Sequence, residues 1–371
     1  MRKSILLASF LVAAALGVGL YLSHAGRRAS AQAITLDRSL VALLPANATT
    51  LVGVDVERLK RTPVYQDLEQ QSESQASPAR NHFDEFVAAT GFDPRRDVQA
   101  LLVASWPPPA AASGAPAAGP GANFVPPQWV AVARGSFNVS ALSSQLRDKK
   151  VFVENYRGVD VFEPNRESQS PPRPHPPRAM GQNPRQPGGF AFLDDKTAVA
   201  GTLPSVLAAI DRKLGGGPSL QANTALLARA ETISAASQVW VVSQNPGEVI
   251  TRALPKNGSA ESSNFARIFS GLQNSTFALD LMNGLNLKAD GLCRTAEDAK
   301  TLGDAARGFV AIGRLAVSQK QPELMVVFDG IHVEENNAAL NISVQVDLTT
   351  FEKLLDRARS QKKVRDVNFS R

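Results

Sequence analysis

"STFALDLMNGLNLKADGLC", residues 275–293, is the stretch of sequence that best defines the fold. Apolar and polar residues alternate on both sides of Asn283-Gly284, which is typical of strands with one buried face. An Asn-Gly pair readily adopts the positive backbone angles that a tight hairpin turn requires. The stretch therefore predicts an antiparallel β-hairpin.

The same pattern predicts further hairpins, with their turns at Arg157-Gly158, at 194–196 and at Asn336-Asn337. These hairpins cover residues 151–163, 189–201 and 323–348. Isolated strands are expected at 49–56, 98–106, 128–134 and 237–244.

Helical spacing of apolar residues predicts helices between the strands. One begins at Glu57 and carries Leu59, Val64 and Leu68 on its inner side. Others are expected at 138–148, 202–214, 222–232, 295–319 and 349–360. In the helix at 295–319, an inward stripe is expected at Leu302, Ala306, Phe309 and Ile312.

These elements predict an α+β fold of antiparallel hairpin sheets with helices packed on one face. Two similar units are expected, at 38–245 and 262–362, followed by a basic tail at 363–371. Four strand-to-helix joins with similar spacing favour an internal duplication, but independent amphipathic patterning explains them equally well.

The first 33 residues form a predicted export signal. Two cations precede an uncharged run of 18 residues from Ile5 to Leu22, which fits either a cleaved signal peptide or a retained signal anchor. The small residues Ala29-Ser30-Ala31 and Ala31-Gln32-Ala33 suit cleavage, whereas the length of the run suits an anchor. Either form predicts that the remaining chain is extracytoplasmic, at the cell membrane if anchored and periplasmic or secreted if cleaved.

The positive charge of the chain is concentrated outside the expected elements. The net charge is +6, but residues 1–30, 164–188 and 360–371 together carry more positive charge than this, so the remainder is mildly acidic. A nucleic-acid-binding face would need Lys and Arg clustered on a folded element. Nucleic acid is therefore not an expected partner.

The sequence does not contain the common patterns of catalytic or metal-binding residues. The four histidines show no metal-ligand spacing, the single cysteine is Cys293, and no phosphate-binding glycine loop or nucleophile elbow occurs. The sequence thus predicts no catalytic residue, no metal site and no cofactor. A carboxylate site formed only in the folded chain remains an alternative.

Two segments, 107–127 and 164–188, are predicted to be disordered Pro-rich loops. The second contains "PPRPHPPR", which favours an extended polyproline II backbone that carries arginines. Such a segment suits an aromatic groove on another protein or an anionic surface. The candidate partner-binding residues are Pro171, Pro172, Arg173, Pro174, Pro176, Pro177 and Arg178. The alternative is a surface insertion without a role.

The segment "LLPANATTLVGVDVERLKRTPVYQDL", residues 43–68, resembles the start of uncharacterised exported bacterial proteins. In these proteins an apolar leader is followed by Leu-Pro and by a strand that enters a helix through Val-Asp-Val. The resemblance implies export and an α+β fold, but it implies no activity.

The sequence therefore predicts a non-enzymatic, exported protein that binds or scaffolds at the bacterial envelope. The run at 5–22 would contact the membrane if it is retained. A periplasmic chaperone or assembly factor and an enzyme are the two alternatives.

Overall fold

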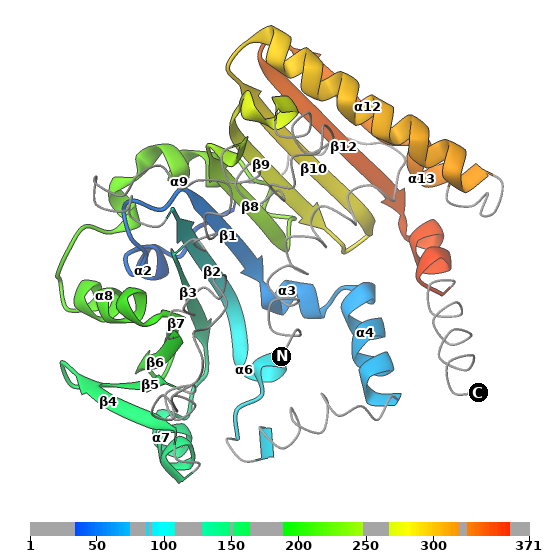
Figure 1. The fold of residues 1–371 in the computed structure, drawn as a ribbon. Coiled ribbons are helices and arrows are strands. Elements are labelled where there is room, and N and C mark those ends of the chain that lie inside the picture. The colour runs from blue at the N-terminus through cyan, green and yellow to red at the C-terminus, as the bar shows by residue number, and fades with distance from the viewer. Residues whose placement is uncertain are drawn as a thin grey trace, which may run out of the picture.

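A computed structural model describes residues 34–74, 87–88, 91–107, 128–148, 151–163, 188–247, 267–318 and 325–356 (Figure 1). The strands within these ranges are β1 (Thr50–Asp55), β2 (Val98–Trp106), β3 (Gln128–Gly135), β4 (Phe152–Tyr156), β5 (Val159–Glu163), β6 (Gly188–Asp194), β7 (Thr197–Thr202), β8 (Val239–Gln244), β9 (Leu272–Asp280), β10 (Gly284–Cys293), β11 (His332–Asn336) and β12 (Ala339–Asp347). The helices include α2 (Arg38–Val41), α3 (Val56–Lys60), α4 (Pro63–Ser74), α6 (Pro94–Asp97), α7 (Val139–Asp148), α8 (Leu203–Lys213), α9 (Thr224–Ala230), α12 (Ala296–Ser318) and α13 (Met325–Asp329).

The strands form one antiparallel sheet in the order β11-β12-β10-β9-β8-β1-β2-β3-β7-β6-β5-β4. Strands β8 and β9, on either side of the expected boundary between the units, pair with each other from Val239↔Leu279 to Gln244↔Asn274. The two predicted units therefore share a single sheet, and the α+β class is confirmed.

The expected hairpins form with their turns at the predicted places. Arg157 and Gly158 join β4 to β5 with φ of 52° and 84°, as the type I′ turn requires. Gly284, with φ of 108°, begins β10 directly after the turn from β9.

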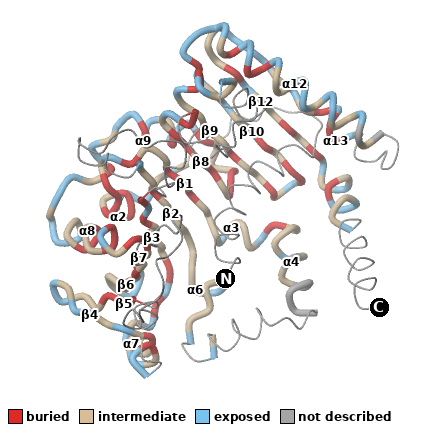
Figure 2. Tube along the Cα trace, in the orientation of Figure 1, coloured by how far each residue is buried: buried red, intermediate tan, exposed pale blue. Residues whose placement is uncertain are grey.

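The helices are divided between the two faces of the sheet. Partner residues of an antiparallel pair point to the same face, so Trp240 shares its face with Gly53 and Leu102 in one direction and with Lys288 in the other. Helices α2, α8 and α9 pack on this Trp240 face over the first half of the chain, where they form the main core. Figure 2 marks the buried positions along these helices and strands in red.

Helix α12 instead packs on the opposite face, over β10 to β12. Its residues Ala299 and Leu302 form a core cluster with Cys293 and Leu340. Leu340 pairs with Gly291 on β10, which lies two residues along the strand from Ala289. Ala289 in turn pairs with Phe277 on β9. Since Phe277 is next to Ala278 on β9, it points away from the Trp240 face. The packing of all helices on one face, expected from the sequence, is therefore not what these contacts show.

The structure corrects two of the predicted elements. Residues 325–329 form helix α13 and not a strand, because a short apolar run fits either element and Phe328 packs its ring against Gly313 of α12. The helix expected from Glu57 is broken into α3 and α4. Buried Thr62 caps α4 by accepting from the Tyr65 N–H at 3.3 Å, and Pro63 takes the first helical position.

The inward stripe expected on α12 is only partly correct. Leu302 is buried and Ala306 is half-buried, whereas Phe309 and Ile312 are 43% and 65% exposed. The start of the helix is as predicted, since Thr295 Oγ1 accepts from the Asp298 N–H at 3.0 Å. Across the described residues, no helix has the length and apolar character needed to cross a bilayer.

Candidate functional site

The segment predicted to bind a partner, from Pro171 to Arg178, lies outside the described residues, as do the leader at 1–33 and the basic tail at 363–371. The structure does place the two ends of its loop on neighbouring strands, since β5 ends at Glu163, β6 begins at Gly188 and Phe162 pairs with Phe190. The role of this loop stays a prediction.

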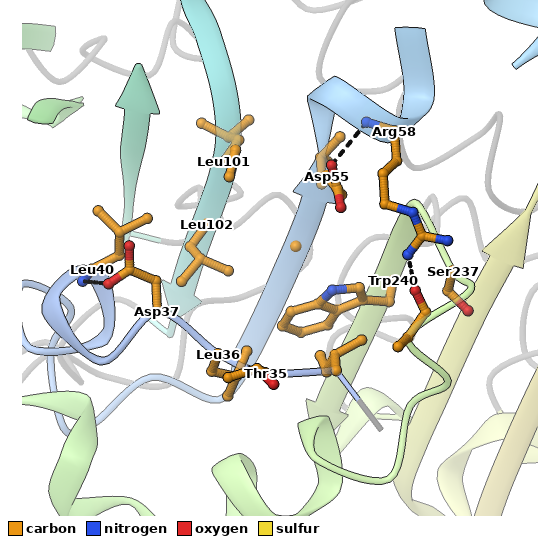
Figure 3. Close-up of a pocket in the computed structure, with 15 residues that line it drawn as sticks. Thr35, Leu36, Asp37, Leu40, Asp55, Arg58, Leu101, Leu102, Ser237 and Trp240 are labelled. Carbon is orange, nitrogen blue, oxygen red and sulfur yellow. Dashed lines mark hydrogen bonds between the residues drawn. The ribbon is translucent and has the colours of Figure 1, made fainter. Parts of the chain in front are cut away.

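A cavity of about 240 Å³ lies between residues 34–40 and strands β1, β2 and β8 (Figure 3). Its apolar lining includes Ile34, Leu36, Leu40, Val54, Leu102 and Trp240. The segment 34–40 lines one side of it and is fixed at its start, because the Ile34 N–H donates to the Ile233 carbonyl at 2.9 Å. The cavity thus lies between the start of the described chain and the Trp240 face of the sheet.

Trp240 and Gly53 form the floor of this cavity. They are direct partners on β8 and β1, and the indole ring occupies the space that a side chain at position 53 would fill. A Cβ atom at position 53 would lie only 2.1 Å from Trp240 Cε2 and Cζ2. Glycine is therefore required at position 53 for the indole to keep this place.

The indole of Trp240 supplies a hydrogen-bond donor that has no acceptor in the part of the chain that the structure describes. The residue is only 5% exposed, and no hydrogen bond involves its Nε1–H. Among the described residues, the fully enclosed polar side-chain atoms that lack a partner are Gln145 Oε1 and Arg314 Nε. Trp240 Nε1 is not one of these atoms and is therefore not fully enclosed. A buried indole N–H normally has a partner, so this donor is available to a molecule in the cavity.

Arg58 supplies a cation at the side of the cavity. Its Nη1 donates to the Ala235 carbonyl and its Nη2 to the Ala236 carbonyl, the latter at 3.2 Å. Within the described residues it forms no ion pair with a carboxylate. Figure 3 shows the guanidinium group beside Ser237, across the indole ring from Leu36 and Leu102.

Two carboxylates line the cavity, and each also begins a helix. Asp37 caps α2 by accepting from the Ser39 N–H at 2.9 Å, and Asp55 caps α3 by accepting from the Arg58 N–H at 2.9 Å. Asp37 also pairs with Arg134 of β3 at 2.7 Å. Burial raises the pKa of Asp37, but the hydrogen bonds from Ser39 and Arg134 and the charge of Arg134 outweigh it and hold that pKa below its usual value.

Three other side chains of reactive types do not line the cavity. Cys293 is buried in the cluster under α12, where burial and then the charge of Asp298 raise the pKa of its thiol. His332 is exposed on β11, with Nδ1 2.9 Å from the Gly330 carbonyl, and Asp194 pairs with Lys213 at 2.6 Å. Among the described residues, no group of three or more His, Cys, Asp or Glu is placed to hold a metal ion.

The sequence did not identify the cavity, because its floor joins residues that are far apart along the chain. Trp240 in "SQVWVVSQ" and Gly53 in "LVGVDV" each fit an ordinary strand. The one available signal was a glycine inside a strand pattern, which often marks the close approach of another group.

No family model matches this sequence, and no curated protein matches it. Among solved structures, crystal form I of TP0453 overlaps with 86% of this chain and 97% of its own, at 11% identity and a TM-score of 0.43. Crystal form III of TP0453 overlaps with 84% and 93%, at 10% identity and a TM-score of 0.45. Both TM-scores are below 0.5, so neither similarity supports a conclusion about the function of this chain.

Proposed function

We propose that this protein is an exported binding protein of the bacterial envelope, tethered to the membrane by its N-terminal run, which takes a small, largely apolar molecule into the Trp240 cavity. The observation that carries this proposal is the Trp240 indole, which is more than nine-tenths buried and presents an N–H without an acceptor among the described residues to an apolar cavity.

The size of the cavity limits the ligand. Its volume of about 240 Å³ exceeds the ~150 Å³ of an apolar cavity that holds benzene, and it lies below the ~300–1,000 Å³ of pockets for drug-sized molecules. A ligand with a short aliphatic or aromatic body and at least one hydrogen-bond acceptor fits these limits.

The place of the cavity along the chain supports the envelope part of the proposal. Ile34 lines the cavity and follows the apolar run, which ends at Leu22, by only 12 residues. Twelve residues span at most about 40 Å. A retained anchor would therefore keep the cavity close to the membrane surface, on its extracytoplasmic side.

The other sequence-based expectations stay predictions. An enzyme would use the cavity carboxylates as acid or base, but both Asp37 and Asp55 hold helix starts. Three further expectations likewise stay predictions. They are the chaperone alternative, the segment 164–188 as a partner-binding loop, and the descent of the two halves from one duplicated unit.

The binding proposal can be tested by ¹⁹F NMR on the full chain in lipid nanodiscs, with tryptophan replaced by 5-fluorotryptophan. The chain has three tryptophans, so Trp→Phe variants assign each resonance. We expect isopentyl alcohol and benzyl alcohol to shift the Trp240 resonance saturably, and the resonance of exposed Trp129 to stay in place.

Two glycine variants provide the matched comparison. Gly53→Ala displaces the indole and should remove the saturable shift, whereas Gly188→Ala, whose Cβ would meet nothing closer than 3.5 Å, should keep it. A Trp240 resonance that does not respond, or that responds equally in Gly53→Ala, would show that the cavity does not bind these molecules.

A further inference from the structure

The cavity carries two opposite charges in addition to its apolar lining, and these charges restrict the ligand further. Arg58 and Asp55 both line it, and they lie one helical turn apart where β1 enters α3. Neither residue forms an ion pair within the described part of the chain.

Each of these charged groups keeps unused hydrogen-bonding capacity. A guanidinium has five N–H donors. Arg58 forms two hydrogen bonds with them, both to backbone carbonyls. The carboxylate of Asp55 accepts the Arg58 N–H through Oδ1, so its Oδ2 retains its acceptor capacity. Asp37, in contrast, is fully engaged by Ser39, Leu40 and Arg134.

The donors and the acceptor of the cavity therefore suit ligand groups of opposite charge. Arg58 and the Trp240 N–H offer donors for an anionic group, and Asp55 offers an acceptor for a cationic group. The remaining lining, formed by Leu36, Leu40 and Leu102, suits a hydrocarbon side chain. A partly buried charge is costly unless it is paired, so a ligand that pairs both charges gains more than one that pairs neither.

From this arrangement we infer that the cavity recognises a zwitterionic α-amino acid with an aliphatic or aromatic side chain. Its carboxylate pairs with Arg58 and accepts from Trp240 Nε1–H, its ammonium pairs with Asp55, and its side chain occupies the apolar part of the cavity. This inference rests on the proposed function, because it names the class of ligand for the same site.

A matched set of four probes separates the contributions of the two charges. L-leucine carries both charges, 4-methylpentanoate lacks the ammonium, isopentylamine lacks the carboxylate, and isopentyl alcohol is uncharged. Their affinities for the full chain in nanodiscs are measured by the Trp240 ¹⁹F shift at pH 7. We expect L-leucine to bind about tenfold or more tightly than each of the other three, since charge-assisted hydrogen bonds are the stronger ones.

Two conservative variants assign the charges to residues. Asp55→Asn keeps a good helix cap but removes the charge, so it should abolish the preference for L-leucine over 4-methylpentanoate. Arg58→Gln should abolish the preference over isopentylamine. Circular dichroism and the Trp129 resonance, which should stay unchanged, verify that both variants are folded.

The outcomes distinguish this inference from the proposed function. If isopentyl alcohol binds and L-leucine binds no more tightly, the cavity binds apolar molecules and the amino-acid inference is overturned. If none of the four probes binds, the proposed function fails as well. A preference for L-leucine that survives both variants would also overturn the assignment of Arg58 and Asp55.

Discussion

Helices α8 and α12 are both amphipathic in sequence, yet the sheet buries them to very different extents. In α8 three of the apolar residues, Val206, Ala209 and Ile210, are fully enclosed. In α12, Leu302 is buried, but Ile312 and Leu315 are 65% and 75% exposed. The apolar pattern of a helix therefore shows that it is amphipathic, but not how much of that pattern the fold will cover.

The position of each helix on the sheet accounts for the difference. Helix α8 packs against β3, β6 and β7, which have further strands on both sides. Helix α12 packs against β10, β11 and β12, at the end of the sheet (Figure 1). A helix at the end of a sheet has fewer strands to cover it, so part of its apolar side remains in solvent.

The largest expected effect comes from truncating one isoleucine on each helix. Ile210→Ala should lower the free energy of unfolding by about 2–5 kcal/mol, because it leaves a cavity in the main core. Ile312→Ala should change it by less than about 0.5 kcal/mol. Urea unfolding followed by circular dichroism measures both. Equal losses would mean that Ile312 is covered in solution.

A glycine pair on α12 should separate its inner and outer sides. A Cβ at Gly313 would lie 2.2 Å from Phe328 Cε1, so Gly313→Ala should force α13 away and lower stability by about 1–3 kcal/mol. A Cβ at Gly308 would meet nothing within 4 Å, so Gly308→Ala should raise stability by up to about 1 kcal/mol. Thermal unfolding of the two variants provides the measurement, and effects of the same sign would contradict the described packing.

The smallest expected effect concerns the ion pairs that join each helix layer to its neighbours. The pKa of Asp37 is lowered in the folded protein, so its contribution to stability is present above the usual carboxyl value of 3.8 and is lost as the pH falls through the lower, folded value. Asp37→Asn should therefore weaken the dependence of stability on pH below about pH 4.

Asp329→Asn is the matched control, because its pair with Arg314 at 3.2 Å is more exposed and should contribute less. Urea midpoints at pH 7, 5, 4 and 3 measure both variants. An equal pH dependence of Asp37→Asn and the unmodified protein would show that folding does not lower the pKa of Asp37.

Most of the sheet was predictable from local sequence. Strand β2 was predicted with its observed limits, and the turns at Arg157-Gly158 and Asn283-Gly284 formed as expected, because turn residues and alternation act over a few positions. Residues 325–329 were not predictable in the same way, because a run of five apolar residues contains too few positions to separate a strand from a helix.

The candidate site could not be predicted, since it depends on contacts between distant segments. The place of Trp240 above Gly53 follows from the pairing of β8 with β1, and the cavity also needs residues 34–40 to return over the sheet. The helix caps at Asp37 and Asp55 could in principle be predicted from the sequence, since aspartate is a common capping residue. That both side chains line the same cavity could not be predicted.

The sequence by itself thus determined the type and order of most of the described elements, because these depend on neighbouring residues. Only the tertiary structure decided which face of the sheet each helix covers, which apolar residues stay exposed, and that Arg58, Asp55 and Trp240 line one cavity. The physical reason is that burial and charge pairing depend on which strands become neighbours, and strand order in a sheet is a non-local property of the chain.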